Sequence, residues 1–381
     1  MTKIKTPYYI VHEDILRRNL SLITDVAQRS GAEIIMAFKA NALWRTFWVM
    51  REYGVKFTAS SLNELQLGNE ELNQLGHSYC PAYTSETIGR YLAGSSHLTF
   101  NSISQYQRFK ADVDEFNQAH EAEDRRVSPG IRVNPQCSVI ETDIYNPALP
   151  GSRFGVTADR IGDTLPEGVE GLHFHQLCES SSYDLEKVLT AFEEQFGKYL
   201  PQVKWVNMGG GHLMTREGYD TEHLVALLRG FRERYPWLKV ILEPGSAFTW
   251  RTGELITSVV DVVENHGIKT AIIDASFACH MPDTLEMPYQ PAITGSLSEG
   301  GYTYRLGGNS CLSGDYMGDW HFDHQLQEGE ELILEDMNHY TTVKTNMFNG
   351  ISHPAMVFKH LDGTIEVLRE FDYSDYKNRM D

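Results

Sequence analysis

The feature that constrains the fold most is an alternation of short apolar or β-branched runs with polar, helix-like stretches. Eight such runs lie between residues 32 and 245: AEIIMAFKA, KFTASS, SYCPAY, HLTFNS, GIRVN, GLHFHQ, WVNMGGG and KVILEPG. This alternation predicts parallel βα units, and eight is the number of units that closes a barrel. We therefore expect an α/β fold built on a (β/α)8 TIM-type barrel.

The stretches between the runs carry helix signals. Two examples are SLNELQLGNEELNQLG from Ser61 and TEHLVALLRGFRERYP from Thr221, each opened by a capping-type residue and stopped by glycine or proline. After about residue 255 the pattern changes to strand-like runs such as ELITSVVDVV and EELILED, separated by glycine-rich loops. We expect a barrel domain over 12–255 and a mostly β domain over 256–381. The opening TPYYIVHEDIL contains a strand that fits either domain, and we assign residues 1–11 to the β domain.

Composition excludes several functional classes. Fifty-two acidic against thirty-three basic residues give a formal charge of -19, which repels nucleic acid and anionic membranes and attracts a polycation, although an acidic surface most often serves only solubility. No segment has the pattern of an export signal or a membrane span. The five cysteines are scattered without CxxC spacing, which favours a reducing cytoplasm. The HFDH cluster at 321–324 lacks further ligands, so no metal is expected.

Unusual residues follow the predicted strands, where barrel enzymes build their active sites. Lys39 ends the first run. A desolvated lysine amine loses its proton and becomes a nucleophile toward a carbonyl; alternatively, its stem packs at the rim while the ammonium reaches water. The Gly209–Gly211 turn would let backbone N–H groups cradle a phosphate, or it is simply a tight turn. Together these residue types suggest a cofactor site.

Glu243 and His175 complete that expected site. Glu243 ends the eighth run and could accept a hydrogen bond from a protonated pyridine nitrogen, or serve as a helix-start carboxylate. The His175 ring could lie against a cofactor ring, with His173 on the same side of the strand and deeper. A lone buried histidine is more often a satisfied core residue. Cys311, with Asp315 four residues on, could be a catalytic thiol or a packing residue.

Six segments, in order, resemble a known family. AFKAN, GLHFHQLCES, NMGGGH, LEPG, GNSCLSGD and NHYTTVKTNMFNG are similar to the Schiff-base lysine, ring-stacking histidine, phosphate-binding glycine, pyridine-nitrogen glutamate, cysteine and C-terminal tyrosine segments of the group IV pyridoxal-phosphate decarboxylases. These enzymes have the alanine racemase-like fold (fold type III). The resemblance runs essentially end to end and is nearest to the carboxynorspermidine/carboxyspermidine branch.

The resemblance implies pyridoxal 5'-phosphate as cofactor and decarboxylation of a carboxylated polyamine to norspermidine or spermidine. The catalytic residues would be Lys39, His175 and Cys311. The cofactor-binding residues would be Lys39, His175, Gly209, Gly210, Gly211, Glu243, Ser246 and Tyr340, and the substrate-binding residues Asp283, Asp315 and Glu243. Cys311 would come from the neighbouring subunit, so the resemblance also implies a homodimer with shared active sites.

Three positions depart from the ornithine-type members of the family. Ser246 stands where they have a phosphate-binding arginine, Cys178 where they have serine, and Thr58 where many carry an acidic residue. These differences argue against ornithine or arginine decarboxylase. The remaining alternatives are a diaminopimelate-type enzyme, an amino-acid racemase, since KANA also resembles the racemase lysine segment, and a catalytically silent regulatory homologue. Glu243 and the cysteine motif favour decarboxylation over racemisation.

Overall fold

The structure is a computed structural model that describes residues 4–123 and 125–381. The chain divides into two compact units. The barrel unit is Asn19–Phe248, and the sheet unit combines the segment up to Arg18 with Thr249–Asp381. Both limits of the barrel unit lie several residues inside the range 12–255 expected from the sequence.

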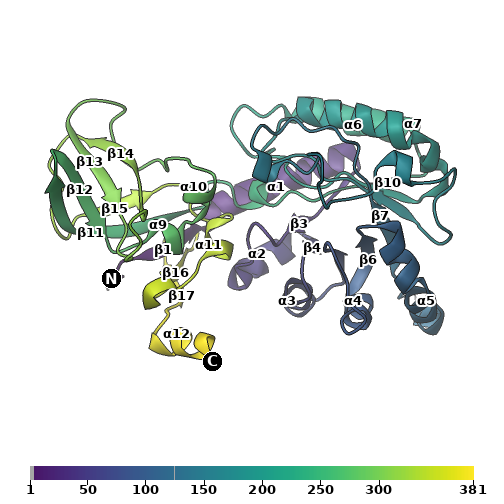
Figure 1. Ribbon diagram of the computed structural model, residues 1–381, viewed down its shortest axis with the longest axis horizontal. Helices are drawn as coiled ribbons and strands as arrows, with labels where there is room; N and C mark the ends of the chain where they lie inside the picture. The colour runs from purple at the N-terminus through teal and green to yellow at the C-terminus, as the bar shows by residue number, and fades with distance from the viewer. Residues whose placement is uncertain (1–3, 124) are drawn as a thin grey trace. The chain divides into compact units, whose positions relative to one another are not determined.

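The barrel unit is built on a ring of parallel strands with helices between them (Figure 1). Its strands are β2 (Glu33–Ile34), β3 (Met36–Ala37), β4 (Phe57–Ala59), β5 (Gly76–Tyr79), β6 (Ser95–Phe100), β7 (Ser128–Arg132), β8 (Gly171–His173), β9 (Trp205–Asn207) and β10 (Lys239–Leu242). Its helices are α1 (Glu13–Ser30, which begins in the sheet unit), α2 (Phe47–Glu52), α3 (Leu62–Leu72), α4 (Ile88–Gly94), α5 (Ile103–Ala119), α6 (Ser182–Phe196), α7 (Thr221–Arg234) and α8 (Ser246–Thr249). Each of the eight predicted runs overlaps a barrel strand.

The first predicted strand closes the barrel. It is split into β2, which pairs with β10, and β3, which pairs with β4. Along it, the amides of Ile35 and Ala37 donate to the carbonyl oxygens of Leu242 in β10 and Pro244 after it (2.9 and 3.1 Å). The amides of Met36 and Phe38 donate to the carbonyl oxygens of Lys56 before β4 and Thr58 in it (2.8 and 3.2 Å). The first predicted run therefore pairs with both β10 and β4 and closes the sheet into a barrel. Counting β2 and β3 as one split strand, the nine strand segments form the expected eight barrel strands.

A tryptophan fills part of the barrel and explains two glycines that begin predicted runs. The Trp205 indole lies against Gly130 and Gly171, where an added Cβ would come within 2.3 and 1.9 Å of the ring. Its Nε1 donates to the Ser128 hydroxyl (2.8 Å). No side chain larger than hydrogen fits at either glycine without moving the ring.

The predicted helix boundaries need two corrections. For α7 the capping residue is Asp220, whose carboxylate accepts from the backbone N–H of His223, and Thr221 is already inside the helix. Ser61 caps α3 as predicted, but α3 ends before Asn73 in the left-handed conformation (φ 52°), short of the expected Gly76. Asparagine tolerates this conformation, which ends a helix as glycine does.

The sheet unit is mostly β, as expected. Its strands are β1 (Tyr8–His12), β11 (Gly253–Asn265), β12 (Ile268–Ile273), β13 (Tyr302–Gly307), β14 (Tyr316–Phe322), β15 (Glu331–Leu334), β16 (Ala355–Lys359) and β17 (Ile365–Arg369). Its helices are α9 (Phe277–His280), α10 (Asp283–Glu286), α11 (Thr341–Lys344) and α12 (Tyr373–Met380). The sheet order is β14-β13-β12-β11-β1-β16-β17, with β15 also on β11. The opening strand thus pairs within the sheet unit.

Candidate active site

Lys39 and His175 meet at the carboxyl end of the barrel. Lys39 follows β3 and His175 follows β8, and the Lys39 Nζ lies 3.1 Å from the His175 Nε2. Residues 136 positions apart in the sequence are thus in direct contact. The contact agrees with the expectation that the last residues of the strands share one mouth.

The His175 ring is held in one tautomer. The backbone N–H of Gly210 donates to its Nδ1 (2.6 Å), so a neutral ring carries its proton on Nε2 and donates it to Lys39. Burial, and next the Lys39 charge, hold the pKa of His175 well below its usual range. Burial, and next the Arg132 guanidinium, lower the pKa of Lys39. The first shift keeps the His175 ring neutral, and the second favours the neutral, nucleophilic form of the lysine amine.

Glu243 is a buried carboxylate fixed by polar neighbours. It is 7% exposed, its Oε1 accepts from the Asn207 side-chain amide (2.6 Å), and its Oε2 lies 3.6 Å from the His173 Nε2. Burial raises its pKa, against the lowering effect of hydrogen bonds from Asn207 and Thr58. Such a group gains most from a hydrogen-bonding cation placed beside it.

The Gly209–Gly211 turn brings its backbone close to His175 and Glu243. Gly209 and Gly211 have φ of 70° and 87°, and a Cβ added at Gly210 would lie 2.4 Å from the Glu243 carbonyl oxygen. The N–H of Gly209 donates to the Asn207 Oδ1 (2.9 Å). The three glycines are therefore required by positive φ and by close approach, and Asn207 links the turn to Glu243.

Sequence reasoning overlooked Asn207 and Arg132. Arg132, at the end of β7, is 4% exposed. Its guanidinium carbon lies 4.7 Å from the Tyr79 ring and 4.5 Å from the Phe154 ring, and its Nη2 donates to the His175 carbonyl oxygen (3.2 Å). Both residues lie inside predicted runs and are the last residues of the observed strands β7 and β9, so a polar residue near the end of a run was the available signal. His173 is 2% exposed, deeper than His175, as expected.

Ser246 and Thr58 also belong to the barrel unit. Ser246 opens α8 directly after Gly245, where an added Cβ would lie 2.5 Å from the Ala40 Cβ. Ala40 follows Lys39 in sequence, so Ser246 is close to the lysine segment. Thr58 hydrogen-bonds to Glu243.

The other predicted site residues lie in the sheet unit. Tyr340 adopts the left-handed conformation (φ 51°) at the start of α11, which is uncommon for an aromatic residue and occurs often at functional sites. Cys311 is exposed, whereas Asp315 is buried. Asp283 binds the Lys344 ammonium (2.5 Å).

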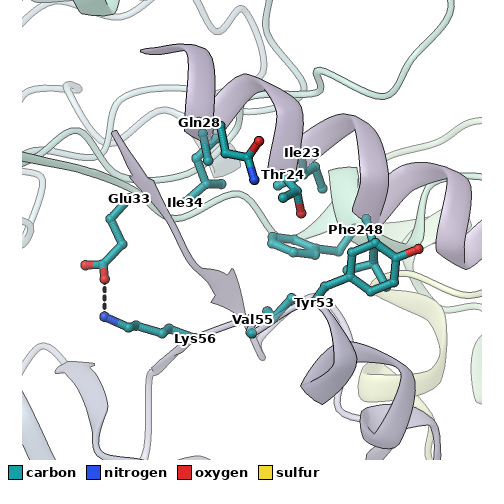
Figure 2. A pocket seen from close by; sticks show the side chains of 12 residues that line it. Ile23, Thr24, Gln28, Glu33, Ile34, Tyr53, Val55, Lys56 and Phe248 are labelled. Atoms are coloured by element: carbon teal, nitrogen blue, oxygen red, sulfur yellow. Dashed lines mark hydrogen bonds and ion pairs between the residues drawn. The ribbon is translucent and has the colours of Figure 1, made fainter. Parts of the chain in front are cut away.

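A separate pocket lies among α1, the β2 strand and the segment after α2 (Figure 2). Its lining is largely apolar, with the Glu33–Lys56 ion pair at one side. Glu33 begins β2, whereas Lys39 follows β3. The pocket thus lies toward the amino-terminal end of the strand and shares no lining residue with the Lys39 site.

Within residues 4–123 and 125–381, no cluster of three metal-binding side chains occurs, and no helix is long and apolar enough to cross a membrane.

Comparisons with known proteins agree with this geometry. The family model described as "Pyridoxal-dependent decarboxylase, C-terminal sheet domain" matches residues 47–338. The chain is 42% identical to a carboxyaminopropylagmatine decarboxylase of Synechocystis (100% of this chain, 96% of the relative). It is 39% identical to a carboxynorspermidine/carboxyspermidine decarboxylase of Campylobacter jejuni (99% of each).

A solved structure is similar over the whole chain. It is the carboxynorspermidine decarboxylase of Campylobacter jejuni complexed with norspermidine, with a TM-score of 0.88 and 38% identity over 99% of this chain and 100% of that one. The family match, the full-length relatives and the shared fold lead to one conclusion: the chain belongs to the family of pyridoxal-dependent decarboxylases, enzymes that use pyridoxal phosphate.

Proposed function

We propose that this enzyme decarboxylates carboxynorspermidine and carboxyspermidine to norspermidine and spermidine in polyamine biosynthesis. The observation that carries the proposal is the meeting of an amine, an imidazole, a glycine turn and a buried carboxylate at one end of the barrel. The Campylobacter relative, named for both substrates, and the similar structure complexed with norspermidine support the choice of substrate.

The residues present fit pyridoxal phosphate. The Lys39 amine would hold the aldehyde carbon, the His175 ring would lie along the cofactor ring, and the Glu243 carboxylate would accept from a protonated ring nitrogen. A Cβ at Gly209, Gly210 or Gly211 would collide with backbone carbonyl oxygens of neighbouring segments, so only glycine lets this turn lie so close to His175 and Glu243; we propose that the turn binds the cofactor phosphate. Ser246 and Tyr340 are proposed as further cofactor contacts.

When bound, pyridoxal phosphate draws electrons away from the substrate α-carbon as CO2 leaves. The chain's own residues prepare this step. Glu243, buried and oriented by Asn207, would keep the ring nitrogen protonated. Lys39, whose amine lies beside His175, would exchange with the substrate amine. Cys311 would help return a proton to the α-carbon.

We propose that Asp283 receives a distal ammonium of the substrate. In the structure Asp283 and Glu286 already bind an ammonium, that of Lys344 (2.5 and 2.6 Å). The same acidic pair would suit either a primary amine or a guanidinium. The 42% identity to the carboxyaminopropylagmatine enzyme therefore makes that compound, which ends in a guanidinium, a second candidate substrate.

Release of CO2 tests the proposal. Purified protein would be incubated separately with carboxynorspermidine, carboxyspermidine, carboxyaminopropylagmatine, ornithine, arginine and diaminopimelate. We expect turnover of the first two. Turnover of carboxyaminopropylagmatine alone would reassign the substrate, and turnover only of the last three would overturn the polyamine assignment. Lys39→Ala should lose both turnover and the colour of bound cofactor, while the surface variant Lys110→Ala should keep both.

We further propose a homodimer with shared active sites that works in the cytoplasm. The supporting features are the resemblance, which assigns Cys311 to the neighbouring subunit, and five free cysteines, which suit a reducing compartment. Mixed dimers of Lys39→Ala and Cys311→Ala should regain activity that neither variant has alone. No recovery, or a monomer by sedimentation, would contradict shared sites, and recovery of the native protein outside the cytoplasmic fraction would contradict the location.

A further inference from the structure

The Cys311 loop is held by a hydrogen bond within the loop and by one to another segment of the sheet unit. The loop connects β13 to β14. The Cys311 thiol is exposed, yet the two consecutive backbone N–H groups of Ser310 and Cys311 are both hydrogen-bonded. The N–H of Ser310 donates to the Asp315 Oδ2 (3.1 Å), and the N–H of Cys311 donates to the Asn349 Oδ1 (2.8 Å).

Asp315 also ties the loop to α9. Its Oδ2 accepts from the Ser276 hydroxyl (2.8 Å) and its Oδ1 from the Ala278 N–H (2.9 Å). Ser276 in turn caps α9 through the Cys279 N–H (3.1 Å). Asp315 is 4% exposed and accepts three hydrogen bonds from its own unit, which leaves its carboxylate little free capacity for a substrate ammonium.

Asn349 approaches the loop from a third segment. It lies in a 3-10 turn, Phe348–Gly350, in the left-handed conformation (φ 57°). The same segment is tied to α9, because the Asn346 side-chain amide donates to the Ala278 carbonyl oxygen (2.8 Å) and its backbone N–H to the Cys279 carbonyl oxygen (2.9 Å). The Cys311 loop, α9 and residues 346–349 therefore form one hydrogen-bonded cluster.

We infer that Asp315 and Asn349 are positioning residues that fix the backbone carrying the Cys311 thiol. Asp315 thus acts through the loop, in place of the substrate contact that the family resemblance implies. The inference rests on the proposed function for the part that Cys311 plays in turnover. The positioning itself does not depend on the substrate.

Asn349 offers a matched pair of variants. Asn349→Gly keeps the left-handed backbone but removes the acceptor, and Asn349→Asp keeps both the acceptor and tolerance of that backbone. Asp315→Asn replaces an acceptor oxygen with a donor. We expect Asn349→Gly and Asp315→Asn to change the alkylation rate of Cys311 by iodoacetamide several-fold, with Asn349→Asp retaining most of the native behaviour. Peptide mapping and a Cys311→Ser variant would identify the labelled thiol.

Kinetics separate positioning from substrate contact. Positioning predicts that Asn349→Gly and Asp315→Asn lower kcat by about tenfold to a hundredfold, with KM little changed. A raised KM with native kcat and native alkylation in Asp315→Asn would show substrate contact and overturn the inference, as would native alkylation in both variants. If the native protein releases no CO2 from any carboxylated polyamine, the proposed function fails, while the alkylation rates still decide the positioning.

Discussion

Among single residues, Asn207 connects two functional groups of the site. Its side-chain Nδ2 donates to the Glu243 carboxylate, and its side-chain Oδ1 accepts from the Gly209 N–H. One side chain thus orients both the buried carboxylate and the glycine turn. A residue with no chemistry of its own can in this way set the geometry on which a reaction depends.

We expect Asn207→Ala to impair both stability and catalysis. Loss of a hydrogen bond to a buried carboxylate lowers the free energy of unfolding by about 1–3 kcal/mol. Because Glu243 would no longer be held in place, we also expect kcat to fall by roughly tenfold. Thermal unfolding and initial rates would measure the two effects. Asn69→Ala is a matched control, because its amide joins the Gln74 and Gly94 carbonyls without touching the site. It should lose stability but keep kcat; equal loss of kcat in both variants would contradict the role of Asn207.

Which site residues the sequence reveals depends on how each one acts. Lys39, His175 and Glu243 are recognisable because their residue types are costly or reactive at the ends of apolar strands. Asn207 and Arg132 also end strands, but their importance lies in partners from other strands. No local pattern encodes those partners, so only the folded barrel identifies them.

Among elements, the barrel strands are matched to one another by the volume of their side chains. The Trp205 ring on β9 occupies space that Gly130 on β7 and Gly171 on β8 leave empty. The runs GIRVN and GLHFHQ predict strands, yet glycine usually weakens a strand. Its presence at the start of both runs is explained by the neighbouring tryptophan.

Gly171→Ala should therefore destabilise the barrel. Its Cβ would lie 1.9 Å from the indole, and overpacking of this kind costs about 1–3 kcal/mol. Combining it with Trp205→Phe, which leaves a smaller ring, should restore part of the loss. Denaturant midpoints of the single and double variants measure this. Additive losses in the double variant would mean that the two residues do not share the space.

At the scale of the whole molecule, buried histidines make stability depend on pH. Burial, the main cause in each case, lowers the pKa of His97 and His212 to about 4 and that of His280 to about 3. An unfolded histidine has a pKa of about 6.5. Between pH 6.5 and about 4 the unfolded chain therefore binds protons that the folded chain does not, and stability falls as the pH drops through this range.

Thermal unfolding between pH 7.5 and 4.5 would test this dependence. We expect the melting temperature to fall below about pH 6.5, and His97→Gln to flatten the fall. His266→Asn, an exposed residue in the turn between β11 and β12, should leave the slope unchanged. A slope that is the same in native protein and His97→Gln would exclude His97 as a source.

The net charge leads to a second prediction at this scale. A chain of charge -19 should attract a polycationic substrate, and added salt screens that attraction. We expect kcat/KM for carboxynorspermidine to fall as ionic strength rises, with kcat nearly constant. Initial rates at increasing sodium chloride concentration provide the measurement. A kcat/KM independent of salt would mean that the acidic residues lie away from the substrate's approach.

The sequence by itself determined the number and order of the barrel strands and the mostly β second unit, and it indicated candidate reactive residues. These follow from local periodicity and residue chemistry, which need no partner. Tertiary structure alone decided that one split strand closes the barrel, that Asn207 joins Glu243 to Gly209, and that Asp315 supports the Cys311 loop. Each of these features depends on contacts between segments from different parts of the fold, and the distance and orientation of the contacting groups are set only once the chain has folded.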